Sequence, residues 1–306
     1  MNIATMVLIV VGLCVFEIVS SIDNAVVNAE VLATMSPKGR KWFLLWGMFF
    51  AVFVVRGLLP WLIIWLATPG LGPWQALTAT FSNDPSIMHA VEYAAPILLS
   101  GGGTFLIFLF FHWLFLEPKN FGLQAEPFFQ KHGIWFYAIV SIILTTLVWF
   151  SGHVSPMMTF GTVLGSTIFF ITHGFKQNAE KAETELVHGD GKSKSDLSKI
   201  LYLEIIDTTF SIDGVLGAFA FTLSVPLIIL GNGLGAIVLR QLTISNMDTI
   251  KKYVYLKNGA MYSIGALGVI MIIDAFGVHI PALVSPLVTI GIIGYFFWKS
   301  KKRIQK

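Results

Sequence analysis

The stretch FEIVSSIDNAV, residues 16–26, places two carboxylates and an amide inside the first long apolar run of the chain. A related stretch, IDTTFSIDGVL, follows at residues 206–216. In both, an acidic residue precedes the aspartate of a Ser-Ile-Asp triplet by six positions. Because a carboxylate at bilayer depth is costly, such an acid is by default a functional-site hypothesis. Its recurrence predicts two related membrane helices that share one function.

The rest of the chain is strongly apolar. Of 306 residues, 55% are hydrophobic and 12% are charged, and the mean hydropathy is +0.76, whereas soluble domains have about 25% charged residues. The alternation typical of a membrane barrel does not occur, which leaves helices to satisfy the backbone in lipid. The predicted fold class is an all-α polytopic membrane protein, a single transmembrane domain over residues 1–306. We expect it in the cell inner membrane, with the lipid bilayer as partner and no nucleic acid.

The apolar runs predict nine spanning helices, each near the ~20 residues that a bilayer requires. They cover residues 4–33, 43–67, 93–116, 134–150, 157–174, 199–224, 226–243, 257–275 and 281–298. Connections that contain Lys or Arg alternate with connections that contain neither. Because basic loops stay in the cytoplasm, we expect the N-terminus outside and the C-terminus in the cytoplasm.

The two halves of the chain repeat more than the acidic stretch. Residues 47–56 (GMFFAVFVVR) and 231–240 (GNGLGAIVLR) both place a glycine nine positions before an arginine. Since the first span runs inward and the sixth runs outward, the halves form a predicted inverted repeat (4+1+4). It consists of repeat one at about 1–150, a connector helix at about 157–174, a cytoplasmic linker at about 175–198 and repeat two at about 199–299. Secondary transporters recurrently use this plan, with the site at the midplane.

Helical periodicity places polar residues of each acidic span on one face. The first span carries Glu17, Ser21, Asn24 and Asn28 on this face. The sixth span carries Glu204, Asp207, Ser211 and Gly214. Asp23 and Asp213 lie off these faces, and they would join the site through a local break in the helix, as in many transporters.

The candidate site combines many oxygen ligands with excess negative charge. Four acids and two mid-span arginines leave an excess that a divalent cation would balance. The predicted metal ligands are Glu17, Asp23, Asn24, Glu204, Asp207 and Asp213, supported by Ser20, Ser21, Ser211, Arg56 and Arg240. Oxygen ligands suit Mn²⁺, Ca²⁺ or Mg²⁺. The alternative is a set of internal salt bridges that holds the two halves together.

Other features predict packing rather than chemistry. His112 lies within an aromatic run and His173 flanks a span, so both are expected to be packed or interfacial. The glycines at 101–103, 161 and 165 predict close helix–helix contacts. The second connection, residues 68–92, is expected to be a turn-rich external loop.

These motifs resemble those of the TerC family, integral membrane proteins associated with tellurium resistance within the LysE-type exporter superfamily. The resemblance covers nearly the whole chain and rests on the two Ser-Ile-Asp motifs, GAIVLR at 235–240, YLKNG at 255–259 and HIP at 279–281. It implies metal-ion export, with manganese as the usual substrate. It also implies metal-site roles for Asp23, Asn24, Asp213, Glu17 and Asp207. Gly214 replaces the asparagine of the first motif, as expected of a divergent branch.

The expected function is therefore export of a divalent cation, with Mn²⁺ as the expected substrate and no bound cofactor. Expelling a double charge against an inside-negative potential costs roughly 4.6 kcal/mol per 100 mV. Crowded carboxylates take up protons when the metal is absent, so cation/proton exchange is the expected coupling. The alternative is a membrane anchor in a metal- or tellurite-stress complex without transport. An enzyme is not expected, because the sequence has no His-Glu-x-x-His spacing or comparable nucleophile motif.

Overall fold

The computed structural model of the chain describes residues 2–47, 49–68, 70–78, 85–119, 121–188 and 195–304. These residues form helices and connections, and no strand occurs among them. Within the described residues, five helices are long and apolar enough to cross a membrane, which confirms the predicted all-α polytopic membrane class. They cover Ile3–Ser20, Glu92–Leu116, Gly133–Val154, Pro156–Asn178 and Leu256–Ala275.

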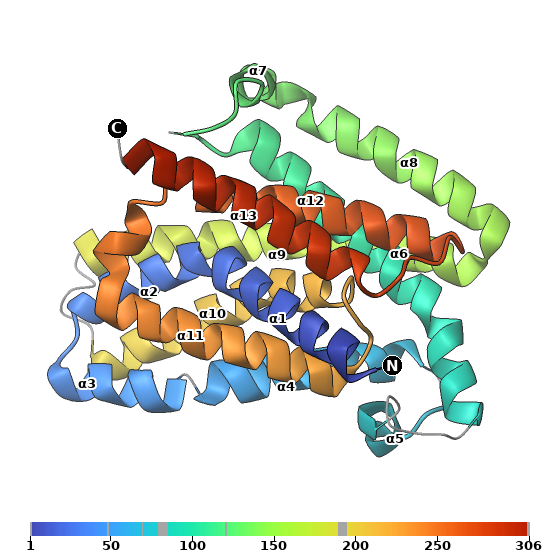
Figure 1. The fold of residues 1–306 in the computed structure, drawn as a ribbon. Helices are drawn as coiled ribbons and strands as arrows, with labels where there is room; N and C mark the ends of the chain where they lie inside the picture. The colour runs from blue at the N-terminus through green and yellow to red at the C-terminus, as the bar shows by residue number, and fades with distance from the viewer. Residues whose placement is uncertain are drawn as a thin grey trace.

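The helices follow one another along the chain (Figure 1). The first half contains α1 (Ile3–Ser20), α2 (Ile22–Ala33), α3 (Pro37–Trp42), η1 (Phe43–Gly47), η2 (Phe50–Val55), α4 (Arg56–Ala67), α5 (Pro73–Thr78), α6 (Pro85–Leu116), α7 (Glu126–Lys131), η4 (Gly133–Trp135) and α8 (Phe136–Val154). The second half contains α9 (Pro156–His188), α10 (Asp196–Ala218), α11 (Val225–Lys251), α12 (Leu256–Ala275) and α13 (Val284–Ile304).

Each of the nine predicted spans coincides with a helix, or with consecutive helices, of the described residues. The first span divides at Ser21 into α1 and α2. The second consists of the π-helical turns η1 and η2 followed by α4. Helix α9 continues to His188, so the first part of the predicted linker 175–198 is helical instead. Membrane crossing by all nine stays a prediction.

Basic connections gather at one end of the bundle. Figure 1 shows α3, which carries Lys38, Arg40 and Lys41, at the same end as the C-terminus and the α11–α12 connection. The N-terminus, α5 and the α12–α13 connection lie at the opposite end. This separation matches a cytoplasmic and an external face under the positive-inside rule. The orientation itself stays a prediction.

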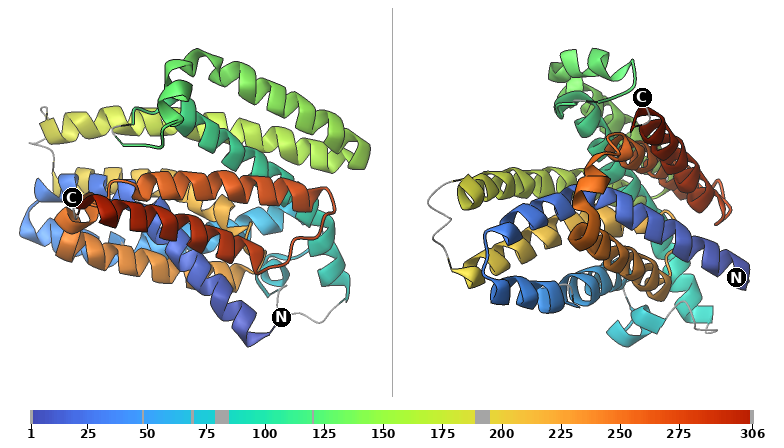
Figure 2. Two further views of the ribbon diagram at one scale, coloured as in Figure 1. Left: turned by 45° about the horizontal axis from the view of Figure 1, so that its top comes forward. Right: turned by 60° about the vertical axis from the view of Figure 1, so that its left-hand side comes forward.

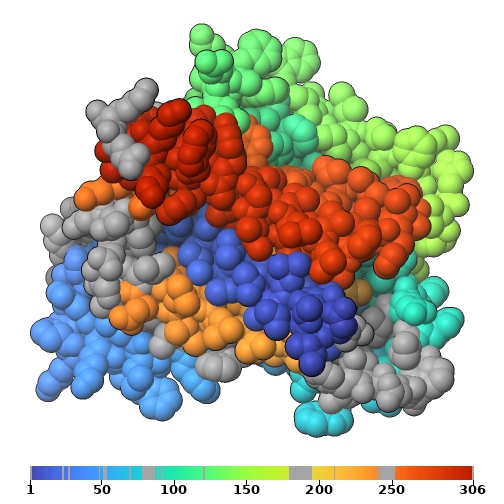
Figure 3. All heavy atoms as spheres, in the orientation of Figure 1, coloured from blue at the N-terminus to red at the C-terminus, as the bar shows by residue number. Residues whose placement is uncertain are grey.

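Helix α1 packs along α11 of the other half. A Cβ added at Gly231 would lie 2.5 Å from Leu13 Cβ, and one added at Gly235 would lie 2.7 Å from Glu17 Cβ and 2.8 Å from the Cys14 carbonyl oxygen. Small residues four positions apart let two membrane helices approach this closely. Figure 3 shows α1 against α11 and α13 on one face of the molecule.

The acidic helix of the second half makes an equivalent contact with the first half. Helix α10 packs on η1, η2 and α4, and the long helices α6 and α12 pack on each other. Each half thus packs its acidic helix on the following span of the other half, as expected from an inverted repeat. The repeat itself stays a prediction. Figure 2 shows α8 at the periphery, where it packs on α9 and α6.

The glycine clusters make the predicted close contacts. A Cβ at Gly165 would lie 2.0 Å from the Gly101 carbonyl oxygen, and one at Gly161 would lie 2.6 Å from the Ile97 carbonyl oxygen. Since backbone cannot yield to such an overlap, only glycine allows α9 to approach α6 this closely. This confirms the predicted packing role of Gly101, Gly161 and Gly165.

The start of α10 is held against α3. Asp196 accepts a hydrogen bond from the Ser36 backbone nitrogen at 3.2 Å and another from the Ser36 hydroxyl. The Ser36 hydroxyl oxygen also accepts from Gly39 N at 3.1 Å and so caps α3. Hydrogen bonds from Ser36 to the exposed Asp196 carboxylate hold its pKa below its usual range. The first connection and the second half are thereby joined.

Candidate functional site

Glu17 is an acid of α1 with 1% of its surface exposed. Its carboxylate rests on α10, because a Cβ at Gly214 would lie only 2.9 Å from Glu17 Oε2. Gly235 of α11 makes room for its Cβ in the same way. The Ser21 hydroxyl donates to Glu17 Oε1 at 2.9 Å. Two glycines of the second half therefore create the space for this carboxylate.

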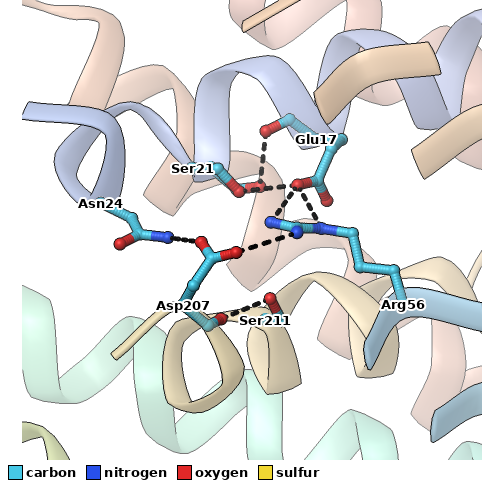
Figure 4. Close-up of polar contacts among 7 residues, drawn as sticks. Glu17, Ser21, Asn24, Arg56, Asp207 and Ser211 are labelled. Atoms are coloured by element: carbon cyan, nitrogen blue, oxygen red, sulfur yellow. Dashed lines mark hydrogen bonds and ion pairs between the residues drawn. The ribbon is translucent and has the colours of Figure 1, made fainter. Parts of the chain in front are cut away.

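Arg56 connects the acids of the two halves. Its side chain is 5% exposed and reaches Glu17 Oε1 from both Nε and Nη2, each at 2.9 Å. Its Nη1 lies 3.6 Å from Asp207 Oδ2. Figure 4 shows the guanidinium between the two carboxylates. A planar guanidinium suits such bridging, because its donors point in fixed directions.

Asp207 completes the contact between halves. It lies on α10 and accepts a hydrogen bond from the Asn24 amide of α2 (Figure 4). Ser211, one turn further along α10, donates to the Asp207 carbonyl oxygen rather than to its carboxylate. We call Glu17, Asn24, Arg56 and Asp207 the cross-half network. Both carboxylates and their arginine are held away from bulk solvent.

Local backbone distortions position this network. At Ser21, between α1 and α2, the φ and ψ angles are −96° and 7°, outside the helical region, although the hydrogen bonds from Ser21 N to Glu17 O and from Ala25 N to Ser21 O persist. On the other side, π-helical η2 ends at Val55, directly before Arg56. Single π-helical turns are frequent at functional sites. By contrast, α10 runs through residues 196–218 without a break.

Asp213 lies elsewhere in the structure. Because α10 is continuous, Asp213 points away from the face that carries Asp207 and Gly214. It makes an ion pair with Lys176 of α9, and each side chain is 14% exposed. Its Oδ1 has no hydrogen-bond partner among the described residues. The local unwinding that would bring Asp213 to the other acids is absent from this described helix.

The remaining predicted residues have varied positions. Glu204 of α10 lies against Gly47 of η1, where a Cβ would be 2.4 Å from Glu204 Oε1. The Ser20 hydroxyl donates to the Glu17 carbonyl oxygen, at 3.4 Å, rather than to a carboxylate of the described residues. The side chains of Asp23 and Arg240 lie outside the described part of the structure.

Sequence reasoning missed Lys176. The sequence predicts that the connector helix ends at about residue 174, which places Lys176 in the cytoplasmic linker. The continuation of α9 to His188 places it on a helix instead, one turn beyond His173. The uninterrupted run from 174 to 188 without proline is the signal that could have predicted this extension.

Two amide oxygens of α2, one of them in the network, lack donors among the described residues. Asn24 Oδ1 and Asn28 Oδ1 are buried on successive turns of α2, with no hydrogen-bond partner among the described residues. Such oxygens are ligands for Mn²⁺, Mg²⁺ or Ca²⁺. Within the described residues, no group of three or more His, Cys, Asp or Glu side chains is arranged to hold a metal. A cation here would therefore draw on amide oxygens as well as carboxylates.

The fold and this network define an all-α polytopic membrane protein with a buried ion network between its two halves. The chain belongs to the DUF475 family, described as proteins of unknown function, whose profile matches residues 22–306. The match takes in Asn24, Arg56 and Asp207, whereas Glu17 precedes it. Neither a curated protein nor a solved structure matches the chain.

Proposed function

We propose that the protein is an inner-membrane exporter of a divalent metal cation, with Mn²⁺ as its substrate and protons as the counter-transported ion. The observation that carries the proposal is the meeting of Glu17 and Asp207, 190 positions apart in the sequence, at one buried arginine. Acids held away from solvent in a membrane protein are functional candidates, and sites of secondary transporters lie where two repeats meet.

The ligand chemistry supports a hard cation. The side-chain atoms that surround the network offer carboxylate, amide and hydroxyl oxygens, from Asp207, Asn24 and Ser21 among others. Oxygen donors select Mn²⁺, Mg²⁺ or Ca²⁺ over softer metals. The resemblance to TerC proteins favours Mn²⁺ among these. Metal-ion export, the ion and the coupling are parts of the proposal.

Arg56 has a definite role in this proposal. With Arg56 between them, Glu17 and Asp207 carry one excess negative charge, so the cation-free protein does not bury two unbalanced acids. A divalent cation would compete with the guanidinium for the same carboxylates. Binding would then loosen the bridge between the halves, and rocking of one half against the other could follow. Protons that occupy the carboxylates after release would reset the site.

The test is Mn²⁺ flux in reconstituted vesicles with an imposed pH gradient. We expect Glu17→Gln combined with Asp207→Asn to reduce the flux to background. Asn24→Ala, which changes no charge, should lower it strongly by removing one ligand oxygen. Flux in either variant at the wild-type rate would contradict the proposal, and absence of flux in the wild-type protein would favour a structural or anchoring role.

The matched control is Glu126→Gln. Glu126 of α7 is also 1% exposed. It accepts hydrogen bonds from Asn258 at 3.0 Å and Tyr262 at 3.1 Å, both on α12 and outside the network. These contacts give Asn258 of the YLKNG motif a structural role, because they dock α7 on α12. We expect the control to fold less stably and to retain flux per folded molecule.

A further inference from the structure

Asn232 of α11 is an amide with no exposed surface. Neither its Nδ2 nor its Oδ1 has a hydrogen-bond partner among the described residues. A buried amide without partners is destabilising, because it loses its hydrogen bonds to water and gains none in return. Such a group points to a partner that the described part of the chain does not supply.

The packing of α11 on α1 fixes where this amide lies. Gly231 lies against Leu13 and Gly235 lies against Glu17, so the two helices run in the same direction. Asn232 is three residues before Gly235, which is ~4.5 Å along the helix axis. It is therefore about one turn from the level of Glu17, toward the N-terminal end of α1. Ile228 and Ala236, one turn away on either side, are buried as well.

Buried amide oxygens without a donor among the described residues thus lie on both sides of Glu17 along the bundle. Asn24 and Asn28 lie on α2, which continues from α1 toward the basic end of the bundle. Asn232 lies on the opposite side, toward the end where Figure 1 shows the N-terminus. The order along the bundle is therefore Asn28, Asn24, Glu17 and Asn232.

We propose that Asn232 binds the transported divalent cation, directly or through its water shell, on the N-terminal side of Glu17. This inference rests on the proposed function and extends it to a route through the protein. An amide supplies a neutral oxygen, which holds a hard cation less tightly than a carboxylate does. It could therefore receive a cation from Glu17 and release it toward the external side.

The experiment is Mn²⁺ flux in reconstituted vesicles, paired with thermal unfolding in detergent, for Asn232→Leu. Leucine has the same branching pattern as asparagine, a somewhat larger volume and no hydrogen-bonding groups in its side chain. We expect the flux to fall at least tenfold, while the unfolding temperature stays equal to that of the wild-type protein or rises. A fall in the unfolding temperature would overturn the inference, since it would show that the amide has a structural partner.

Two further variants complete the test. Asn232→Asp keeps a ligand oxygen, so we expect flux within threefold of wild type and half-saturation at a lower Mn²⁺ concentration. Thr289→Val removes a hydroxyl that is equally buried and unpartnered among the described residues but lies on α13, outside the network. It should leave the flux unchanged. Wild-type flux in Asn232→Leu, with Glu17→Gln inactive, would overturn this inference alone, whereas an inactive wild-type protein would overturn the proposed function.

Discussion

The two copies of the acidic motif have similar sequences and different structures. In the first copy the helix is distorted at Ser21, and both Glu17 and Asn24 reach the cross-half network. In the second copy α10 is continuous, so Asp207 reaches the network while Asp213 pairs with Lys176. The comparison teaches that both copies contribute an acid to one site, whereas the second aspartate of the second copy, held off the shared face by a continuous helix, pairs with α9 instead.

The difference between the copies at the position after the second aspartate has a physical reason. Asn24 of the first copy corresponds to Gly214 of the second. Asn24 supplies a donor to Asp207, whereas Gly214 supplies the space in which the Glu17 carboxylate lies. The two positions thus serve opposite carboxylates across the same contact, and an asparagine in both would leave no room for Glu17.

The largest expected effect is that of Arg56→Met. Without the guanidinium, Glu17 and Asp207 face each other as uncompensated buried charges, so we expect a loss of about 3–5 kcal/mol in the free energy of unfolding. Part of the loss should be recovered at lower pH, because protonation neutralises both acids. Denaturant titration in detergent at two pH values measures this. The control Lys301→Met, at an exposed position, should change stability by less than about 0.5 kcal/mol, and an equally small effect at Arg56 would contradict the bridging role.

The next effect concerns the second copy. Lys176→Met and Asp213→Asn should each lower stability by about 1–3 kcal/mol, because each leaves a largely buried charged or polar group without its partner. The double variant should lose less than the sum, with a coupling energy of about 0.5–3 kcal/mol. A double-mutant cycle of unfolding free energies measures this, and additive losses would show that the ion pair contributes nothing. Mn²⁺ flux in Asp213→Asn then decides whether the second aspartate also serves transport.

A smaller effect is expected at the position where the copies differ. Gly214→Ala places a methyl group 2.9 Å from Glu17 Oε2. Because this atom is the end of a side chain that can shift, we expect a cost of about 1 kcal/mol, at the low end for overpacking. In the control Gly291→Ala on α13, nothing lies within 4 Å of the added carbon, so helix propensity should stabilise the protein by about 0.5–1 kcal/mol. Thermal unfolding compares the two. Equal changes in unfolding temperature would mean that the Glu17 carboxylate does not need the space that Gly214 leaves.

The smallest effect concerns the hydrogen bonds from Ser36 to Asp196, which join the first connection to the start of α10 outside the network. The pKa of Asp196 is lowered by hydrogen bonds from Ser36. The stability that these hydrogen bonds contribute is therefore fully present above the ordinary carboxyl pKa of about 3.9. It is lost as the pH falls through the lowered value. We expect Asp196→Asn to lower the unfolding temperature slightly at neutral pH and to remove this part of the acid dependence. Identical pH profiles for the variant and the wild-type protein would refute the contact's contribution.

Sequence periodicity predicted the faces of the acidic helices correctly. Asp207 and Gly214 share the face that meets Glu17, and Asp213 lies off it. The apolar runs also predicted the membrane class and the positions of the helices, because length and hydropathy are local properties of the chain. Metal binding by these residues stays a prediction.

The partners of these faces could not be predicted in the same way. Periodicity shows which side chains share a face, but not which neighbouring helix lies opposite, so neither the Arg56 bridge nor the Lys176 pair followed from it. An apolar run such as residues 43–55 reads equally well as an α-helix or as π-helical turns. Whether the Asn232 amide finds a hydrogen-bond partner depends on how several helices pack around it, and no local sequence pattern predicts this packing.

The contact of α1 with α11 has a consequence for synthesis. Leu13 and Glu17 meet Gly231 and Gly235, residues that the ribosome adds 218 positions later. At ~5–20 residues per second, the newly inserted first helix waits roughly 10–45 s for the surface that it finally covers. During this interval the Glu17 carboxylate must be tolerated in or near lipid. Its described partners from the first half are the Arg56 guanidinium and the Ser21 hydroxyl. A chain that ends before residue 231 would leave the face of α1 with Leu13 and Glu17 uncovered. Proteases that degrade misassembled membrane proteins could then recognise this face.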